Sequence, residues 1–370
     1  MKGEESGHGN SMKAPTPPDV RELVDRTLAD AVKQRASDLH VEPTAQGYEL
    51  RLRIDGLLQT IAKYDQTIGR SIVGRLMVMA QLLTYRLDVP QEGRMEMPVE
   101  GQTLHLRVSV MPTTHGLRAA VRMPAELLQP KALDDLGLPE PTLVALQSFA
   151  KSDSGMLIVT GPAGSGKTTT IYALLAQIKS MQPGLSVISL EDPVERDVPG
   201  VTQIEVKPFG ELTYERALRS MLRQDPQVLA LGEIRDATTA SIAVQAALSG
   251  HRLVCTLHAS SPVGALARLV EMGIEPYQVS SAVFGIVSQR LVRRRDAAGY
   301  HGRVPIAQTM LMDAAIRKAI LEKADTQGVE QIASRQPGFQ SLQAAAEALV
   351  AQGLTDREEV DRVLGQGDAR

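Results

Sequence analysis

The sequence predicts an α/β protein whose main domain is a parallel β-sheet covered by helices, with a smaller α+β domain before it and a helical end after it. Short, continuous apolar runs alternate with helical patterns in the middle of the chain, and a Gly-rich segment follows the first run. Nearer the N-terminus, apolar and polar residues alternate. Continuous runs are typical of strands buried on both faces of a parallel sheet, whereas alternation is typical of strands with one exposed face.

The composition limits the classes of protein to which the chain can belong. Its 370 residues are enough for two or three domains, and 43% apolar and 22% charged residues are ordinary for a globular protein. The net charge of −3 gives no general attraction to nucleic acid. The single cysteine, Cys255, excludes an internal disulfide and a multi-cysteine zinc site, and its apolar neighbours predict a buried thiol. With no signal-peptide pattern and no apolar run near the ~20 residues of a membrane span, we expect a cytoplasmic protein.

The first 123 residues are expected to form a tail and a small domain. Residues 1–18 are rich in Gly, Ser and Pro, which predicts a disordered tail. Residues 19–123 contain an amphipathic helix capped by Asp19 and a second helix near residues 66–83. The clearest strand patterns are residues 48–54, 104–110 and 119–123. These elements predict an α+β domain on an antiparallel sheet.

The main domain is expected over residues 138–310, after a linker at residues 124–137. Its predicted strands are residues 156–160, 186–190, 228–231 and 253–256. Ala-rich periodic segments beyond residue 310 predict a helical C-terminal subdomain over residues 311–370.

The Gly-rich segment is the most informative motif in the chain. It matches G-x-x-x-x-G-K-[ST] and lies between a predicted strand and a predicted helix, as this motif requires. In such a loop, backbone N–H groups surround phosphate, Lys167 contacts the β- and γ-phosphates, and the Thr168 hydroxyl binds Mg²⁺. The motif predicts binding of a nucleoside triphosphate; a Gly-rich turn without a ligand is the alternative. The predicted phosphate-binding residues are Gly161, Pro162, Ala163, Gly164, Ser165, Gly166, Lys167, Thr168 and Thr169.

Two acidic clusters follow predicted strands of the same sheet. Glu233 is expected to polarise the attacking water, or to bind Mg²⁺ through a water. Glu191 and Asp192 follow another strand, and the carboxyl ends of parallel strands share the edge where ligands bind. His258 follows a third strand, where it either senses the γ-phosphate or is a structural hydrogen-bonding residue. Two acidic clusters around one metal favour hydrolysis over simple binding, with Glu233, Glu191, Lys167 and His258 as the predicted catalytic residues.

Together with the Gly-rich loop, three further segments resemble motifs of a known family. Residues 191–195 (Glu-Asp-Pro-Val-Glu), 232–236 (Gly-Glu-Ile-Arg-Asp) and 250–258 (Gly-His-Arg-Leu-Val-Cys-Thr-Leu-His) resemble the Asp box, Walker B and His box of the secretion ATPases. These are the hexameric motors of type II secretion and type IV pilus assembly. Residues 36–43, 53–56, 90–94, 107–112, 270–276 and 289–292 extend the resemblance over roughly residues 36–325. Four motifs in the same order are far more specific than any one of them.

The resemblance implies a RecA-like P-loop ATPase domain joined to a PAS-like N-terminal domain, with ATP and Mg²⁺ bound between the two domains. It implies a homo-oligomer, a hexameric ring, that works with platform or docking proteins of a secretion or pilus machine. The protein would therefore be peripheral to the inner membrane through its partners.

The resemblance also implies a set of phosphate-directed arginines. Arg107 and Arg122 of the small domain match arginines that approach the bound phosphates. Arg219, Arg223, Arg235 and Arg268 match basic residues of the ATPase domain. Arginine binds phosphate oxygens bidentately, and Arg219 and Arg223, four residues apart, share one helical face. For Arg219, Arg223 and Arg268, a surface salt bridge is the alternative.

The chain departs from the larger assembly ATPases in two ways. Those proteins usually carry a four-cysteine zinc module after the segment that matches residues 289–295; here only residues 296–298 (Asp-Ala-Ala) stand there, so no zinc is expected. We also expect the extended N-terminal domain of larger members to be absent. Pilus retraction ATPases are short and zinc-free too, and residues 315–322 match their C-terminal signature in part. The remaining segments favour the assembly branch.

We therefore expect a motor that hydrolyses ATP to ADP and phosphate to power assembly of a type II secretion pseudopilus or a type IV pilus. A pilus retraction ATPase is the first alternative. A RecA-like nucleic-acid motor is the alternative from a different class. The negative net charge and the few aromatic residues argue against it, so nucleic acid is not expected as a partner. A scaffold that binds ATP without turnover is opposed by the two acidic clusters. The basic run at residues 290–295 is expected to be a solvated face or the contact for an acidic partner.

Overall fold

The computed structural model describes residues 19–99, 102–123, 132–206, 212–297 and 299–365. The chain divides into two compact units, Met1–Leu127 and Leu128–Arg370. The tail predicted at residues 1–18, and residues 124–131 of the predicted linker, lie outside the described residues. The boundaries predicted from the sequence at residues 19–123, 124–137, 138–310 and 311–370 remain predictions.

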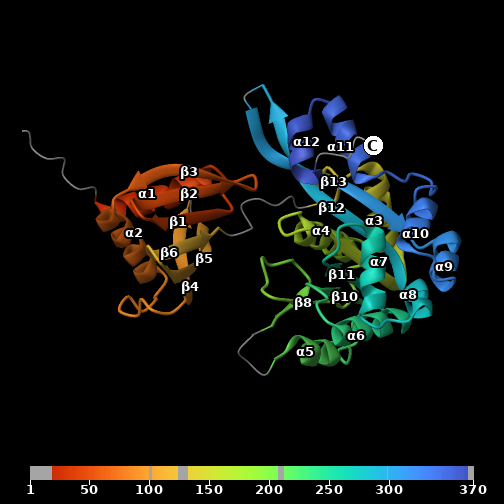
Figure 1. The fold of residues 1–370 in the computed structure, drawn as a ribbon. Helices are drawn as coiled ribbons and strands as arrows, with labels where there is room; N and C mark the ends of the chain where they lie inside the picture. The colour runs from red at the N-terminus through yellow and green to blue at the C-terminus, as the bar shows by residue number, and fades with distance from the viewer. Residues whose placement is uncertain (1–18, 100–101, 124–131, 207–211, 298, 366–370) are drawn as a thin grey trace, which may run out of the picture. The chain divides into compact units, whose positions relative to one another are not determined.

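The first unit is an antiparallel sheet with helices α1 and α2, as the α+β prediction requires (Figure 1). In the described residues its strand order is β3-β2-β1-β6-β5-β4. Asp19 caps α1, its side chain accepting from the N–H of Arg21 at 2.9 Å. Strands β1 and β4 were not predicted. The elements are α1 (Val20–Lys33), β1 (Asp38–Thr44), β2 (Gly47–Ile54), β3 (Leu57–Tyr64), α2 (Gln66–Met79), β4 (Gln91–Val99), β5 (Gln102–Thr113) and β6 (Gly116–Arg122).

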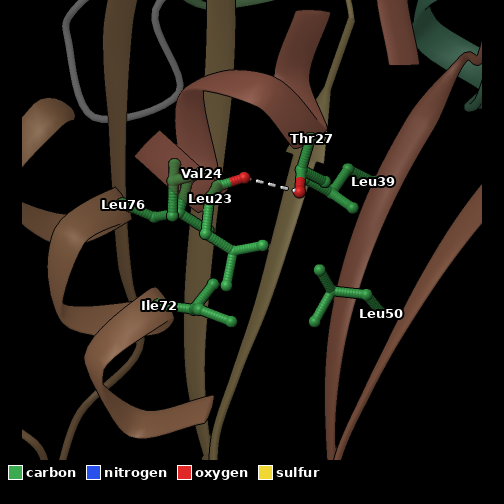
Figure 2. Close-up of a pocket in the computed structure, with 7 residues that line it drawn as sticks. All are labelled: Leu23, Val24, Thr27, Leu39, Leu50, Ile72 and Leu76. Atoms are coloured by element: carbon green, nitrogen blue, oxygen red, sulfur yellow. Dashed lines mark hydrogen bonds between the residues drawn. The ribbon is translucent and has the colours of Figure 1, made fainter. Parts of the chain in front are cut away.

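The core of this unit lies between the two helices and one face of the sheet. Figure 2 shows the seam between the helices and the sheet, where aliphatic side chains of α1 and α2 point toward those of β1 and β2. Thr27 satisfies its hydroxyl within α1 by donating to the carbonyl oxygen of Leu23 at 2.7 Å. This seam is the hydrophobic core of the unit and offers no polar group to a ligand. Its lining residues are Leu23, Val24, Thr27, Leu39, Leu50, Ile72 and Leu76.

The second unit is a largely parallel sheet covered by helices on both faces (Figure 1). Among the described residues the strand order is β13-β12-β7-β11-β10-β8-β9. All four predicted strands are present, as β7, β8, β10 and β11. The strands are β7 (Gly155–Thr160), β8 (Val187–Glu191), β9 (Thr202–Glu205), β10 (Val228–Leu231), β11 (Arg252–Leu257), β12 (Val283–Asp296) and β13 (Gly299–Leu311). The helices are α3 (Glu140–Lys151), α4 (Lys167–Met181), α5 (Tyr214–Met221), α6 (Ala237–Leu248), α7 (Pro262–Glu271), α8 (Pro276–Ala282), α9 (Ala314–Leu321), α10 (Thr326–Ala333), α11 (Leu342–Ala351) and α12 (Arg357–Leu364), with a 3₁₀ turn η2 (Asp134–Leu136).

Alternate residues of the central strands pack on opposite faces, which is why these strands have continuous apolar sequences. In β7, Leu157 and Val159 pack with α3 and α4, whereas Met156 and Ile158 pack with α5 to α10. Cys255 of β11 is buried in the second of these cores, as predicted. Both faces of the sheet are therefore covered, and polar groups can be presented to a ligand only at the strand ends.

The β12–β13 hairpin was not predicted from the sequence. Its strands pair antiparallel from Gly285 and Leu311 to Asp296 and Gly299. A separate small core joins this hairpin to α11 and α12. In the described part of the chain, no helix is both long enough and apolar enough to span a bilayer.

Candidate functional site

The site lies where β7, β10 and β11 reach their carboxyl ends. β11 pairs with both other strands: Thr160 at the end of β7 is opposite Leu257, and Leu231 at the end of β10 is opposite Cys255. The segments that follow these strands are the phosphate loop, the turn of Glu233 and the turn of His258. Because β11 separates the other two strands, His258 is placed between the loop and Glu233.

The phosphate loop is shaped to surround an anion. Gly164 and Gly166 have φ values of +75° and +90°, which are open to glycine and costly for other residues. Helix α4 begins at Lys167 without a side-chain cap among the described residues, so its first N–H groups have no side-chain acceptor. A helix N-terminus with free N–H groups and a partial positive charge is the environment that phosphate prefers. The loop therefore fits the triphosphate that its sequence predicts.

Lys167 lies folded over the loop. Its Nζ donates to the carbonyl oxygens of Gly161 at 2.8 Å and Pro162 at 2.9 Å. Burial lowers the pKa of Lys167, Glu233 raises it, and Arg290 lowers it further. The charge of the Lys167 ammonium is therefore influenced both by the Glu233 carboxylate and by the Arg290 guanidinium.

Glu233 is the centre of a charged group at the same edge. Its Oε1 lies 2.6 Å from Nε2 of His258, and its Oε2 lies 2.5 Å from Nε of Arg235. Arg235 also reaches Asp192, with Nη1 3.6 Å from Oδ2. The structure thus brings together three predicted residues: His258 contacts Glu233 directly, and Arg235 joins Glu233 to Asp192. A carboxylate held by an imidazole and a guanidinium can accept a proton from a water molecule and pass it on.

Thr168 and Glu233 are the predicted metal ligands. The Thr168 side chain is exposed at the start of α4, so its hydroxyl is open to a ligand. Across the described ranges, no group of three or more His, Cys, Asp or Glu is arranged to hold a metal ion. Mg²⁺ in phosphate-transfer sites is held by one or two protein groups together with waters and the phosphates themselves. The residues present fit a magnesium ion of that kind.

Buried hydroxyl groups fix the turns that carry Glu233 and His258. Tyr214 accepts from the Glu233 N–H at 3.2 Å and donates to the carbonyl oxygen of Leu190 at 3.1 Å. Thr160 accepts from the N–H of Ala259 at 2.9 Å, which ties the turn after His258 to the end of β7. Burial raises the pKa of Tyr214, so this phenol stays protonated and keeps donating.

Glu191 takes part in a different network. Its carboxylate accepts from the hydroxyls of Tyr172 and Ser189 and from Nε2 of Gln203. Within the described residues, no hydrogen bond or ion pair joins Glu191 to Lys167 or to the Glu233 group. Tyr172 belongs to α4, so this buried carboxylate links the helix of the phosphate loop to the end of β8. The catalytic role assigned to Glu191 from the sequence remains a prediction.

Arg107 and Arg122 belong to the first unit, where they lie directly opposite each other on β5 and β6. Arg107 is also opposite Arg94 on β4. On the other side, Arg122 is opposite Asp38 on β1, which is itself opposite Arg53 on β2. Directly opposed residues share a face, and like charges there destabilise each other. The phosphate-directed role of Arg107 and Arg122 remains a prediction.

In the described part of the chain, no hydrogen bond or ion pair joins Arg219 or Arg223 to the phosphate loop. They line an open pocket of about 360 Å³, together with residues at the end of α6 and His251 before β11. That pocket lies at the amino ends of the strands, opposite the edge that carries the loop. Arg219 forms an ion pair of 3.0 Å with Glu215, and Arg268 forms one of 3.3 Å with Glu271. Their contact with nucleotide remains a prediction.

Sequence reasoning missed several polar residues that support the site. Tyr172 and Tyr214 are two of only seven tyrosines in the chain, and a buried tyrosine needs a partner for its hydroxyl. Gln289 and Arg290 lie on β12 and bond to the phosphate loop and to the turn after His258. Both residues lie in a segment that resembles the family, and Arg290 also begins the basic run at residues 290–295.

Comparisons with known proteins decide the family. The family model described as "Type II/IV secretion system protein" matches residues 16–362. The chain belongs to the type II/IV secretion system protein family. The type II secretion system protein HxcR of Pseudomonas aeruginosa is 36% identical over 364 residues, covering 93% of this chain and 77% of that protein. The type II secretion system ATPase E of Vibrio cholerae is 35% identical over 382 residues, covering 93% and 75%.

Solved structures of related ATPases share the fold of this family member. The pilus retraction motor PilT with bound ADP is 26% identical, with a TM-score of 0.66, over 93% of this chain and 97% of that one. The ATPase DotB of Legionella pneumophila is 22% identical, with a TM-score of 0.76, over 95% and 97%, and shows the fold alone. The RecA-like P-loop fold and the membership inferred from the sequence are confirmed. The chain is a secretion ATPase, and nothing in these comparisons supports a nucleic-acid motor. ATPases of this family act as oligomers together with other proteins of their machinery.

Proposed function

We propose that this secretion ATPase hydrolyses ATP to power assembly of a type II secretion pseudopilus or a type IV pilus at the inner membrane. The observation that carries the proposal is the phosphate loop on an uncapped helix, next to Glu233 held by His258 and Arg235. The names of the similar proteins from P. aeruginosa and V. cholerae support type II secretion. The likeness to PilT keeps retraction as the second candidate.

In the proposed mechanism the loop N–H groups and Lys167 position the triphosphate. Thr168, and Glu233 through a water, would hold Mg²⁺, which would supply charge neutralisation at the phosphates. Lys167 would leave the Gly161 and Pro162 carbonyl oxygens for the phosphate oxygens, which are stronger acceptors. Glu233 would orient the attacking water and accept its proton at Oε1, next to Nε2 of His258.

The proposal extends to a hexameric ring, as the resemblance to the secretion ATPases implies. In such a ring Arg107 and Arg122 would add guanidinium groups to the phosphates. Loss of the γ-phosphate would remove part of that contact and let the ring change its conformation. Platform or docking proteins at the inner membrane would receive this movement.

The test is steady-state ATPase activity against protein concentration for wild type, Lys167→Ala and Glu233→Gln. We expect specific activity to rise with concentration as rings form, and both variants to lose at least about a hundredfold in turnover. Glu233→Gln should still bind ATP. Glu347→Gln is the matched control, because Glu347 of α11 is an exposed carboxylate in an ion pair with Arg357, and neither residue belongs to the predicted site. Wild-type turnover by Glu233→Gln would show that its catalytic assignment is wrong.

Assembly and retraction are separated in the host cell. A strain that carries Lys167→Ala as its only copy should fail to export the machine's substrates or to form pili if the protein drives assembly. Cells that still form pili but cannot withdraw them would support retraction instead.

A further inference from the structure

Gln289 is a buried polar residue that was not among the predicted nucleotide-binding residues; its side chain is only 2% exposed. It lies on β12, which runs parallel to β7, and it directly follows Ser288, the partner of Thr160 in that register. Strand β7 ends at Thr160, and the phosphate loop begins at Gly161. Gln289 is therefore the β12 residue that lies beside the start of the loop.

Both ends of the Gln289 amide are hydrogen-bonded to the phosphate-loop segment. Its Nε2 donates to the carbonyl oxygen of Ser165 at 2.9 Å, and its Oε1 accepts from the Thr170 hydroxyl at 2.9 Å. A carbonyl oxygen can only accept, so these partners fix the orientation of the amide. Ser165 and Thr170 lie on either side of Lys167 and Thr168 in the chain. One side chain thus holds the residues that bracket the predicted phosphate and magnesium ligands.

The approach of β12 also explains two glycines of the loop. A Cβ on Gly161, where φ is +143°, would lie 2.3 Å from the carbonyl oxygen of Gln289. A Cβ on Gly166, where φ is +90°, would lie 2.7 Å from Nε2 of Gln289. These separations are too short for any real Cβ contact. Packing against the backbone of β12 therefore requires glycine at position 161, whereas a Cβ at position 166 would displace the Gln289 amide, whether or not nucleotide is bound.

The next residue of β12 extends the contact to the turn after His258. Arg290 donates through Nη1 to the carbonyl oxygen of Gln289 at 2.9 Å, and through Nη2 to that of Ser260 at 3.0 Å. Ser260 is two residues beyond His258. Gln289 therefore hydrogen-bonds to the phosphate loop, and Arg290 hydrogen-bonds to the turn that carries His258.

We propose that Gln289 is a positioning residue for the nucleotide. Its amide holds the phosphate loop in the conformation that receives a nucleoside triphosphate, so that it sets affinity without touching the nucleotide. Without the amide, the Ser165 carbonyl oxygen and the Thr170 hydroxyl would be buried and unpaired, and the loop would move to satisfy them. Ordering the loop again on binding would then weaken the complex. The inference rests on the proposed function, because it assumes that nucleotide binds at this loop.

The test is binding of a non-hydrolysable ATP analogue with Mg²⁺ to the full-length protein. Gln289→Met keeps the length of the side chain and removes both hydrogen bonds. Gln308→Met is the matched control, because Gln308 is a buried glutamine on β13 with no hydrogen bond to the loop in the described residues. We expect the dissociation constant to rise roughly tenfold or more for Gln289→Met and less than about twofold for Gln308→Met. Binding by Gln289→Met within twofold of wild type, or an equal loss in the control, would overturn the proposal.

A second variant, Gln289→Glu, tests hydrogen bonding rather than packing. Its carboxylate can still accept from Thr170, but it cannot donate to Ser165 until it is protonated. Burial beside a carbonyl oxygen should raise its pKa, so its affinity relative to wild type should improve as the pH falls from about 8 to about 6. A pH-independent ratio would contradict the proposal, and this measurement decides the matter if Gln289→Met does not fold.

The two proposals fail in different ways. If wild type and Lys167→Ala both fail to bind the analogue, nucleotide binding at the loop is wrong, and the inference about Gln289 falls with it. If wild type binds, Lys167→Ala does not, and Gln289→Met binds as wild type does, only the inference about Gln289 is wrong.

Discussion

Glu359 is the buried centre of the contact between the C-terminal helices and the β12–β13 hairpin. Its side chain is 0% exposed, and its carboxylate accepts from Nε of Arg293 at 2.9 Å and from Nε and Nη2 of Arg362 at 2.7 and 2.6 Å. The backbone N–H of Arg293 adds a fourth hydrogen bond at 2.8 Å, and Nη2 of Arg293 forms an ion pair of 2.7 Å with Oε2. Burial raises the pKa of Glu359, but the hydrogen bonds from Arg362 and Arg293 outweigh it and lower the pKa from 4.5 to about 2.

Glu359→Gln removes the negative charge and leaves two guanidinium groups facing an amide. The difference between 4.5 and about 2 corresponds to about 3 kcal/mol at about 1.4 kcal/mol per pH unit. Removal of one partner of a buried ion pair costs about 3–5 kcal/mol. Arg362 is partly exposed, so water screens part of the loss. We therefore expect the free energy of opening α12 to fall by about 3 kcal/mol at pH 7.

The assay is hydrogen exchange of α12 in the full-length protein, since exchange reports the opening of one segment. Glu347→Gln is the control: Glu347, on the neighbouring α11, pairs with Arg357 at 3.6 Å and both side chains are exposed. We expect that control to lose less than about 0.5 kcal/mol. A loss below about 1 kcal/mol for Glu359→Gln would refute the estimate made from burial and hydrogen bonding.

The same residue predicts a pH dependence. The folded-state pKa of Glu359 lies below its ordinary value, so the stabilisation is fully present above about pH 4.5 and is lost as the pH falls toward 2. Thermal unfolding of wild type and Glu359→Gln should therefore differ most at neutral pH and converge between pH 4.5 and 2. A difference that stayed constant over this range would show that the lost charge is not the cause.

Three further outcomes are expected. Tyr172→Phe leaves the buried Glu191 carboxylate without one donor and should lower the free energy of unfolding by about 1–3 kcal/mol in denaturant titrations. Arg219→Ala breaks only an exposed ion pair, so its melting temperature should stay within a few degrees of wild type; a loss of ATPase activity in this stable variant would then support its predicted role at nucleotide. Gly161→Ala would place a Cβ 2.3 Å from the Gln289 carbonyl oxygen, and we expect a loss of about 1–3 kcal/mol in thermal unfolding even without nucleotide. Wild-type stability of that variant would show that the loop can move away from β12.

Much of the fold follows from local patterns in the sequence. The strands at β7, β8, β10 and β11 were predicted because both of their faces are buried, which makes their sequences continuously apolar. The β12–β13 hairpin escaped prediction because its outer half carries arginines, which are not typical of a buried strand. The acids that pair with two of these arginines, Asp356 and Glu359, come about sixty residues later. The acidic partner expected for the basic run is thus, at least in part, the chain's own α12.

By itself, the sequence determined the phosphate loop, its glycines and the acids that end the strands, because backbone conformation and strand-end position depend on residues close in the chain. Only the tertiary structure decided which of those groups meet. It joined Glu233 to His258 and Arg235, turned Glu191 toward Tyr172, and set Gln289 against the loop. The physical reason is that β11 lies between β7 and β10, and β12 lies on the other side of β7. This strand order is set by the packing of whole strands and helices, which no local pattern encodes.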